Sequence, residues 1–383
     1  MWLKGKCSFD LCELSSAQVK GANRPVVLKK LGKKGFVKRH SVQATPWQFA
    51  VAIARASTTR SEAIPLGYFR ALAAYGNLQA NVTAVGGRVH ANHGLLSLLR
   101  DSERTGWSAA VAQGFCWLVA MEHFGCSAVV DFAAGCTLLN PPVVAPKLNE
   151  ERPDFIGWDA KVAELSLFES KGGTAITADK VKWKSGLREA LGQLAAGRTR
   201  LHPQHGAKLK REIAVCLAWV EGSPAVGAFA DPEREPEGEG SSQVKLAMLR
   251  THFAAWAGSL GAFDAADRLF AGARVPSRPV DLSDGLVAVL DRRDGLGVPE
   301  FLLDGRGFAL PGWPYIGPGS VAPVLPVVDR TVWQGVIRGD IDQALGGLAA
   351  ASARVADRRI RTEGSESSAA DWYLADGTAY VEF

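Results

Sequence analysis

The order of the apolar segments between residues 107 and 220 constrains the fold of this chain more than any other feature. A long apolar stretch of helical character, GWSAAVAQGFCWLVAMEHFG, comes first and stops at Gly125. Three strand-like runs follow, CSAVVDF, RPDFIGW and AELSLFESK, and then an amphipathic helix whose apolar stripe includes Leu187, Ala190 and Leu194. REIAVCLAWV predicts a last strand. This order of helix, three strands, helix and strand predicts a mixed α/β layer.

The regions on either side of this layer have different patterns. From Thr45 to Phe124 the pattern is mainly helical, and Pro46 follows Thr45 as the first residue of a predicted helix. After the last strand, the acidic stretch ADPEREPEGEGSSQ favours a linker or an exposed loop. Beyond it, a helix and Gly-rich strands indicate an α+β region, in which Asp376-Gly377 predicts a two-residue hairpin turn. The predicted regions are residues 1–100, 101–225 and 241–383.

Positive charge is concentrated at the start of the chain. Residues 1–100 hold 15 Lys and Arg against three acidic residues, a net charge of +12, whereas the whole chain carries +5. A basic segment of this kind binds a polyanion through the release of counterions. A solvated basic arm, or a surface that docks on the acidic remainder of the chain, is the alternative. The lysines expected to contact nucleic acid here are Lys29, Lys30, Lys33 and Lys34.

Composition narrows the class of protein. Hydrophobic residues make up 47% of the chain and charged residues 22%, as in ordinary globular proteins. No apolar run reaches membrane-spanning length, and the first residues lack the apolar core of a signal peptide. The six cysteines form no C-x-x-C pair, which argues against a structural zinc site and favours reduced thiols. We therefore expect a cytoplasmic protein with no membrane partner.

Two charged residues end the third predicted strand, where the alternating pattern calls for apolar residues. Side chains alternate along a strand, so Glu169 and Lys171 extend the leucine face of AELSLFESK. Burying charges is costly unless they are paired or bind a metal. Either the end of the strand reaches solvent, or a site at this position needs both charges.

Asp154 is the expected partner of these charges. A short turn joins its strand to the strand of Glu169, so the two should pair as a hairpin, and a twist or bulge would bring the two carboxylates together. Two carboxylates and the backbone carbonyl of Ser170 make a hard oxygen site suited to Mg²⁺ or Mn²⁺. Such an ion activates a bound water and neutralises charge on a phosphate. Lys171 is expected to hold or deprotonate the attacking water and to stabilise the transition state.

These residues and their order resemble a known nuclease superfamily. Pro153-Asp154 on the second predicted strand and Glu169-Ser170-Lys171 on the third resemble the PD-(D/E)XK phosphodiesterases, which include restriction endonuclease-like and Holliday-junction resolvase-like nucleases. The core of that group is a helix, three strands, a helix and a strand, the order predicted here from Trp107 to Val220. The resemblance implies that Asp154 and Glu169 bind the metal and that Lys171 is the catalytic lysine. It also implies a metal-dependent DNA nuclease, with a restriction or anti-phage defence role.

The resemblance implies further site residues. An additional acid often comes from the helix before the first strand, where Glu122 is the candidate and Asp131 its competitor. Some related nucleases carry Q-x-x-x-Y on the following helix; Gln193 matches the glutamine, but Gly197 stands at the tyrosine position. Gln193 is then either a contact to phosphate or metal-bound water or an ordinary polar helix residue. The same helix carries basic residues at a spacing of four: Lys180, Lys184 and Arg188. They form either a ridge that contacts phosphates or an exposed face that keeps the helix soluble.

Two other functions stay open at this stage. In one, the fold is kept as a nucleic-acid-binding or assembly module, and Asp154, Glu169 and Lys171 are structural charges. In the other, the chain is the endonuclease subunit of a transposition or repair complex. DNA is the expected nucleic acid, with RNA as the alternative. The acidic C-terminal region is expected to build a homodimer or to dock a partner protein.

Overall fold

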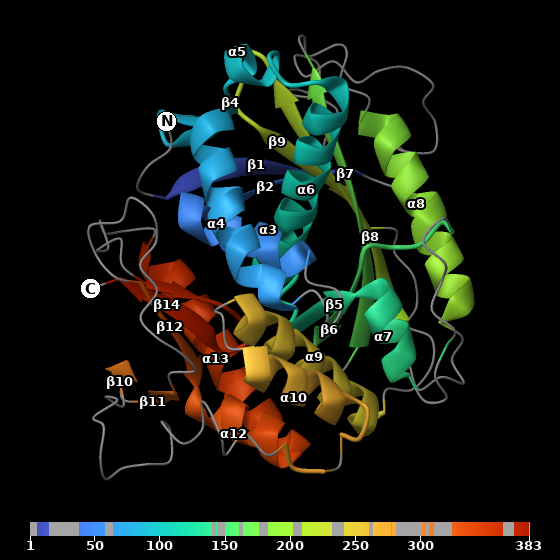
Figure 1. Cartoon of the computed structure of the whole chain (residues 1–383), viewed down its shortest axis with the longest axis vertical. Helices are drawn as coiled ribbons and strands as arrows, with labels where there is room; N and C mark the ends of the chain where they lie inside the picture. Colours follow the sequence, from blue (N-terminus) through green and yellow to red (C-terminus); the bar gives the residue numbers. More distant parts are fainter. Residues whose placement is uncertain are drawn as a thin grey trace.

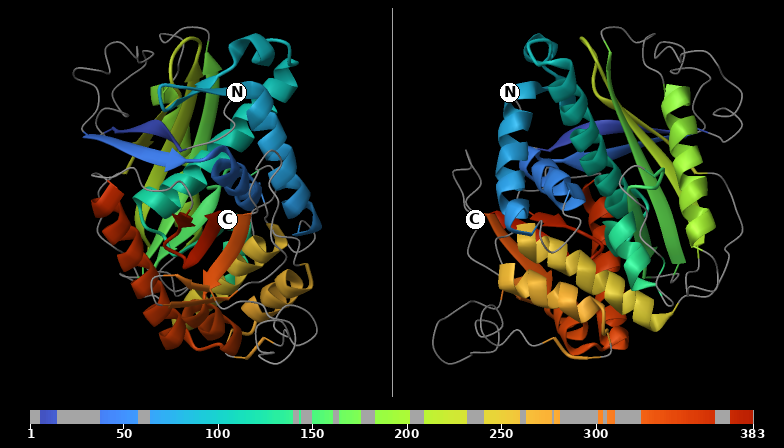
Figure 2. Two further views of the ribbon diagram at one scale, coloured as in Figure 1. Left: turned by 90° about the vertical axis from the view of Figure 1, so that its left-hand side faces the viewer. Right: turned by 45° about the vertical axis from the view of Figure 1, so that its right-hand side comes forward.

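The chain folds into a mixed α/β structure, and the part of it that the structure describes contains two sheets (Figure 1). The computed structural model describes residues 6–14, 38–57, 64–139, 143, 150–160, 164–175, 183–201, 209–231, 241–259, 263–276, 278–280, 301–303, 306–309, 324–362 and 371–382. Two further views show the larger sheet with helices packed on both of its sides (Figure 2). None of the described helices is long and apolar enough to cross a membrane.

The larger sheet joins strands that lie between Cys7 and Ala230 in the sequence. Its strands are β1 (Cys7–Glu13), β2 (Lys38–Ala44), β3 (Val82–Val85), β4 (Arg88–Ala91), β5 (Ala128–Asp131), β6 (Phe155–Asp159), β7 (Glu164–Ala175), β8 (Leu209–Val220) and β9 (Val226–Ala230). Within the described residues their order is β3-β4-β1-β9-β8-β7-β6-β5, and β2 pairs with β1. The pairs β5–β6 and β6–β7 are antiparallel, whereas β7 and β8 are parallel. The sheet is therefore mixed.

The boundary expected at residue 100 does not divide this sheet. β1 pairs in parallel with β9, which follows the central strands in the sequence. The β3–β4 hairpin also interrupts the stretch from Thr45 to Phe124 that was predicted to be mainly helical. Strands from before that boundary thus extend the central sheet, because β1 supplies the edge that β9 would otherwise expose.

Helices cover both faces of the central strands. They are α3 (Pro46–Ser57), α4 (Ile64–Asn81), α5 (His93–Leu96), α6 (Asp101–Leu118), the π-helical turn η2 (Val119–His123), α7 (Phe132–Leu138), α8 (Trp183–Arg200), α9 (Ser242–Ser259) and α10 (Phe263–Ala273). α6 and α8 lie on opposite sides of the β7–β8 pair (Figure 1). Leu167 and Phe168, which point to opposite faces of β7, are consequently both fully buried. The sequence predicted one apolar face for this strand. In the structure both of its faces are buried.

The predicted elements from α6 to β8 occur in the expected order: α6, β5, β6, β7, α8 and β8. The short helix α7, which the sequence did not predict, stands between β5 and β6. The predicted start of α3 is also confirmed. Thr45 Oγ1 accepts a hydrogen bond from the Gln48 backbone N–H (3.2 Å), and Gln48 Oε1 accepts one from the Thr45 N–H (2.7 Å). This reciprocal pair is a capping box, which fixes where the helix begins.

The C-terminal region adds a second sheet. Its strands are β10 (Phe301–Leu303), β11 (Arg306–Ala309), β12 (Val324–Asp329), β13 (Asp371–Tyr373) and β14 (Thr378–Glu382), beside the helices α12 (Arg330–Arg338) and α13 (Ile341–Thr362). The predicted hairpin turn lies between β13 and β14. Leu374 N–H donates to the Thr378 carbonyl (2.9 Å) and Gly377 N–H to the Leu374 carbonyl (3.1 Å). The loop is therefore longer than the expected two-residue turn, with Gly377 at a φ of +83°.

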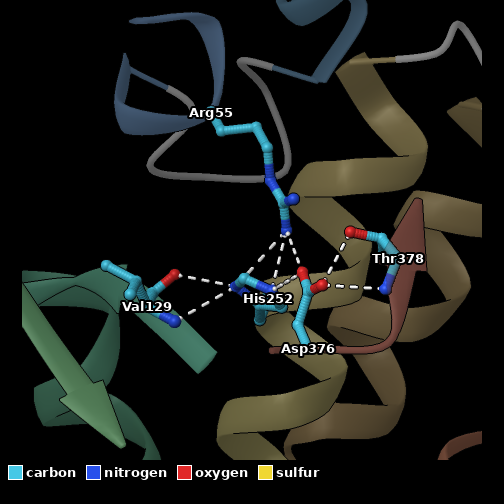
Figure 3. Close-up of polar contacts among 5 residues, drawn as sticks. All are labelled: Arg55, Val129, His252, Asp376 and Thr378. Carbon is cyan, nitrogen blue, oxygen red and sulfur yellow. Dashed lines mark hydrogen bonds and ion pairs between the residues drawn. The ribbon is translucent and has the colours of Figure 1, made fainter. Parts of the chain in front are cut away.

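A buried polar network ties this turn to the rest of the protein (Figure 3). Asp376 Oδ2 accepts hydrogen bonds from Arg55 Nη2 of α3 (3.2 Å) and His252 Nε2 of α9 (2.7 Å). Its Oδ1 accepts from the backbone N–H (2.8 Å) and the hydroxyl (2.6 Å) of Thr378. His252 Nδ1 lies 3.1 Å from the backbone nitrogen of Val129 on β5. Segments from the N-terminal, central and C-terminal parts of the sequence thus meet at one carboxylate.

Candidate active site

The β6–β7 pairing places Asp154 directly opposite Glu169. Phe155 pairs with Phe168 in this antiparallel ladder, so Asp154 and Glu169 are the next two residues to face each other. The predicted hairpin is confirmed, and the register brings the two residues together without the expected twist or bulge. Asp154 precedes β6 by one residue, whereas Glu169 lies on β7 where that strand continues past the end of β6.

Hydrogen bonds hold the Asp154 carboxylate in place. Its Oδ2 accepts from the Ser170 backbone N–H (2.8 Å) and the Ser170 hydroxyl (2.5 Å), and its Oδ1 accepts from Gln113 Nε2 of α6 (3.1 Å). The N–H and the C=O of one strand residue point to the same side of the strand. The Ser170 carbonyl therefore faces the side on which Asp154 lies. The carbonyl expected from the sequence thus lies on the same side of β7 as the Asp154 carboxylate.

Glu169 is a buried carboxylate with one satisfied oxygen. Only 3% of the residue is exposed, and Oε1 lies 2.9 Å from Lys171 Nζ, while Oε2 has no hydrogen-bond partner in the described part of the chain. Burial and then the charge of Asp154 raise the pKa of Glu169 to about 8, and Lys171 offsets them only in part. The Asp154 backbone N–H also lowers the pKa of Glu169, by less than Lys171 does.

Lys171 contacts two residues of α8 as well as Glu169. Its Nζ lies 3.1 Å from Glu189 Oε1 and donates a hydrogen bond to Gln193 Oε1. Burial lowers the pKa of Lys171, but the charges and hydrogen bonds of Glu169 and Glu189 outweigh burial and raise it. The lysine is therefore a cation near neutral pH. Of the two roles expected for it, this charged state favours holding the attacking water over removing its proton.

Close packing of α8 against the Asp154 segment explains the departure from Q-x-x-x-Y. A Cβ atom on Gly197 would lie 2.3 Å from Pro153 Cγ, so the position has no room for a tyrosine. Gly197 also lets α8 reach the residue that precedes Asp154. One turn before Gly197 on this helix, Gln193 contacts Lys171 as described above. Glu189, a site residue that the sequence prediction missed, could have been found from its spacing of four to Gln193.

The additional acid expected from the preceding helix, Glu122, belongs to the turn that follows α6 and not to the part of that helix that reaches Asp154. Glu122 lies in η2, close to the start of β5, where Ala128 pairs with Trp158 at the far end of β6 from Asp154. The helix residue that reaches Asp154 is Gln113, which the prediction also missed. The reason is the position of α6: the Ser108 carbonyl would lie 2.3 Å from a Cβ on Gly172, so the middle of the helix crosses β7 beside the site.

Asp131, the competitor of Glu122, lies nearer to the cluster. It pairs with Phe155, the neighbour of Asp154, in the β5–β6 ladder. Its Oδ1 accepts a hydrogen bond from the Ala134 N–H (2.9 Å) and caps α7. Burial is the main cause that raises the pKa of Asp131, and the charge of Asp154 adds a smaller rise. Asp131 is thus electrostatically coupled to the site while its side chain is used as a helix cap.

The expected nucleic-acid contacts are placed only in part. Arg188 lies on α8 with an exposed side chain, and the buried stripe of this helix contains Leu187, Ala190 and Leu194, as predicted. Lys184 belongs to α8, but the structure describes only its backbone. The remaining candidates lie outside the described residues: Lys29, Lys30, Lys33, Lys34 and Lys180.

The oxygen donors of the cluster fit a hard divalent cation. Among the described residues, no group of three or more His, Cys, Asp or Glu side chains has the geometry of a metal site. Mg²⁺ needs fewer protein ligands, because it is commonly held by one or two carboxylates and keeps several waters. Glu169 lies opposite Asp154, and its Oε2, which has no hydrogen-bond partner among the described residues, is the type of donor that such an ion binds. Asp154, Glu169 and the Ser170 carbonyl are the residues that could hold it.

Comparison with known proteins provides no evidence on function, so the geometry of this cluster is the basis of the functional argument. The sheet pairing, the unsatisfied carboxylate and the Lys171 contacts are observed directly in the structure of this protein. They specify a candidate site of two carboxylates, one ammonium group and a backbone carbonyl in the middle of β7, beside the start of β6. No family model, no curated protein and no solved structure matches the chain.

Proposed function

We propose that this protein is a Mg²⁺-dependent nuclease that hydrolyses phosphodiester bonds of DNA. One observation carries the proposal: Glu169, a buried residue opposite Asp154, contacts the cation of Lys171 through Oε1, while its Oε2 has no hydrogen-bond partner among the described residues. A carboxylate with a strongly raised pKa is costly to keep, and groups of this kind concentrate at functional sites. A divalent cation would neutralise the repulsion between the two carboxylates.

Each residue of the cluster has a role in this proposal. Asp154, Glu169 and the Ser170 carbonyl hold the ion, which lowers the pKa of a coordinated water and offsets charge on the scissile phosphate. Lys171 donates to the water or to a phosphate oxygen and stabilises the negative charge that develops there. Gln193 orients the ammonium group of Lys171. Gln113 and the Ser170 side chain orient the carboxylate of Asp154.

The arrangement of the central elements supports a restriction endonuclease-like core. The helix α6 precedes three strands paired antiparallel to one another, and α8 precedes β8, which lies parallel to β7. Asp154 stands at the start of the second strand, and Glu169 and Lys171 stand on the third. These are the positions that the resemblance to the PD-(D/E)XK phosphodiesterases implies. The order and pairing of these elements thus resemble those of the PD-(D/E)XK core, which supports the proposed chemistry.

The proposed substrate is a polyanion because the segment 1–100 carries a net charge of +12. Such a segment binds a phosphate backbone without reading its sequence. On α8, the exposed Arg188 follows the buried Leu187 and adjoins Glu189, which contacts Lys171. A backbone that reaches Lys171 would therefore pass close to Arg188. A role in restriction or defence against phage is a further part of the proposal.

A binding or assembly module without catalysis is the second candidate. The observation in its favour is the ion pair between Glu169 and Lys171, at 2.9 Å, which satisfies one carboxylate oxygen without any metal. In that case both charges are structural, and the protein would bind nucleic acid through its basic segment alone. The two candidates differ in whether Glu169 and Asp154 need a divalent cation.

A cleavage assay on several substrates tests the proposal. Supercoiled plasmid, linear duplex DNA, single-stranded DNA and single-stranded RNA are incubated with the protein in Mg²⁺, Mn²⁺ or EDTA. We expect cleavage of DNA that requires the metal and disappears in Glu169→Gln. Asp101→Asn removes a carboxylate whose side chain is 92% exposed on α6 and should leave cleavage intact. Absence of metal-dependent cleavage of all four substrates would overturn the proposed function.

A further inference from the structure

Three acceptors occupy the ammonium group of Lys171. Its Nζ lies 2.9 Å from Glu169 Oε1 and 3.1 Å from Glu189 Oε1, and it donates to Gln193 Oε1. A lysine ammonium has three N–H donors and no acceptor. The three contacts therefore use the full donor capacity of Lys171. Lys171 can donate to a phosphate oxygen only after one of these acceptors has moved away.

The three acceptors differ in how easily they can leave. Glu169 stands two residues before Lys171 on the same strand, and only 4% of its side chain is exposed. Gln193 is neutral and lies one helical turn beyond Glu189, in a partly buried position. The side chain of Glu189 is 66% exposed, so water can solvate its carboxylate once the contact breaks. Exposed ion pairs of this type contribute little free energy, which makes Glu189 the acceptor that costs least to displace.

The chemistry of Glu189 also matches that of the group expected to replace it. A carboxylate and a phosphate both present a negatively charged oxygen to the ammonium donor. Two such anions repel each other, so Glu189 cannot keep its position while a phosphate binds Lys171. Arg188, the residue next to Glu189, is exposed and provides a positive charge on the same stretch of α8.

We propose that Glu189 is a gate of the site: its carboxylate occupies the donor of Lys171 that a backbone phosphate of the nucleic acid takes, and the substrate displaces it. The inference rests on the proposed function, since it assumes that Lys171 meets a phosphate. Glu189 thus weakens nucleic-acid binding in the resting protein. Its removal tightens binding, and only when Lys171 is present to use the free donor.

A double-mutant cycle measures this dependence. Binding of a short fluorescent duplex DNA is measured in EDTA at one fixed ionic strength for the wild type, Glu189→Gln, Lys171→Gln and the double variant. We expect Glu189→Gln to lower Kd by about 3- to 5-fold, the scale of one exposed ion pair. The gain should disappear in the Lys171→Gln background. Because Glu189 is exposed, its substitution by glutamine leaves the packing of α8 unchanged. The neutral amide oxygen of glutamine is a weaker acceptor for Lys171 than a carboxylate and does not repel a phosphate, so the phosphate displaces it more easily.

Asp101→Asn is the matched control for a general effect of charge. Asp101 is an exposed helix residue that pairs with Arg104, so its substitution also removes a carboxylate from a cation without touching the site. We expect it to change Kd by less than about 2-fold, since exposed pairs of this kind are screened. An equal gain in Asp101→Asn and Glu189→Gln would show that net charge alone is responsible and would overturn the gate.

The outcomes separate the gate from the proposed function. If the wild type cleaves DNA with Mg²⁺ but Glu189→Gln binds the duplex no more tightly, the gate is wrong and the nuclease proposal stands. A gain that persists in Lys171→Gln likewise contradicts the gate, because the freed donor is then not the cause. If the wild type neither binds the duplex nor cleaves it, the proposed function fails, and the gate fails with it.

Discussion

Two buried carboxylates in this protein have opposite electrostatic environments. Asp376 is fully buried and accepts hydrogen bonds at both oxygens, from Arg55 and His252 at one and from Thr378 at the other (Figure 3). Burial alone would raise its pKa, but the His252 hydrogen bond and the Arg55 charge outweigh burial and lower the pKa to about 2. Glu169, almost as deeply buried, has a pKa raised to about 8 and one oxygen without a partner among the described residues.

The difference between these carboxylates separates a structural cluster from the one that we propose to be functional. The network of Asp376 joins α3, α9 and the C-terminal turn, all in the interior, and its charge stabilises the fold. The cluster of Glu169 stands in the middle of β7, where this strand continues past the end of β6, and its lysine reaches the exposed side chain of Glu189. Its repulsion with Asp154 lowers stability. Local costs of this kind are expected where a protein binds a ligand or performs chemistry.

The largest expected effect is the loss of cleavage when the site is changed. Lys171→Ala should lower the cleavage rate by on the order of 10²–10³-fold, the usual result of removing one group that stabilises developing charge. Glu169→Gln and Asp154→Asn should lose at least as much, because each removes a ligand of the ion. Single-turnover cleavage rates with Mg²⁺ measure the effect. Normal cleavage by all three variants would show that the site lies elsewhere.

The same chemical change should have opposite effects on stability at the two carboxylates. Asp376→Asn leaves buried Arg55 without its counter-charge and should lower the free energy of unfolding by about 3–5 kcal/mol. Glu169→Gln removes a repulsive, unsatisfied carboxylate, so in EDTA the free energy of unfolding should stay the same or rise. Urea denaturation of both variants makes the comparison. If Glu169→Gln is as damaging as Asp376→Asn, the Glu169–Lys171 pair is structural and the contrast is lost.

The pH dependence of stability should also differ in sign. The folded-state pKa of Glu169, about 8, exceeds its usual 4.5, so the folded protein holds this proton more tightly than the unfolded chain. The stabilisation that this bound proton gives to the folded protein is complete below pH 4.5 and is lost as the pH rises through about 8. Asp376, whose pKa falls from 3.8 to about 2, loses its contribution as pH falls through that window. Unfolding free energies from pH 5 to 9 in EDTA should decline less in Glu169→Gln than in the wild type; parallel curves would contradict the raised pKa.

The contact between α8 and Pro153 should matter more than other positions on this helix. Gly197→Ala places a Cβ 2.3 Å from Pro153 Cγ, so it should cost about 1–3 kcal/mol and displace the neighbouring Asp154. Gly192→Ala is the matched control on the same helix, because nothing lies within 4 Å of its Cβ. It should stabilise the protein by up to about 1 kcal/mol. Denaturation and cleavage measured together check the pair; equal stabilities would show that α8 is not held by this contact.

Much of the central fold could be predicted from local patterns. Alternation, helix periodicity and the caps at Thr45 and Gly125 indicated the elements from α6 to β8 in their order. The long-range pairing was not predictable in this way. β1, near the start of the chain, joins β9, which comes after every other strand of the larger sheet, and the network of Asp376 joins α3 to the last hairpin. Such contacts depend on tertiary packing, which a local sequence window does not contain.

The site shows the same limit on a smaller scale. Asp154, Glu169 and Lys171 were predicted together because all three lie on one hairpin, whose register follows from a short turn. Gln113 and Glu189 were missed because they come from helices packed on opposite sides of that hairpin. Glu122 was chosen by its place at the end of a helix, whereas close packing at Gly172 brings the middle of α6 to the site.

Stabilisation by a divalent cation tests the central claim most directly, because it needs no knowledge of the natural substrate. Thermal unfolding of the wild type is followed with increasing Mn²⁺ or Mg²⁺ and compared with an Asp154→Asn, Glu169→Gln double variant. A site that binds the ion only in the folded state gains about 2.7 kcal/mol at 100 times its Kd. We predict that Tm of the wild type rises with metal and that Tm of the double variant does not. A wild type whose Tm ignores both metals at millimolar concentration would contradict the account and favour the binding module.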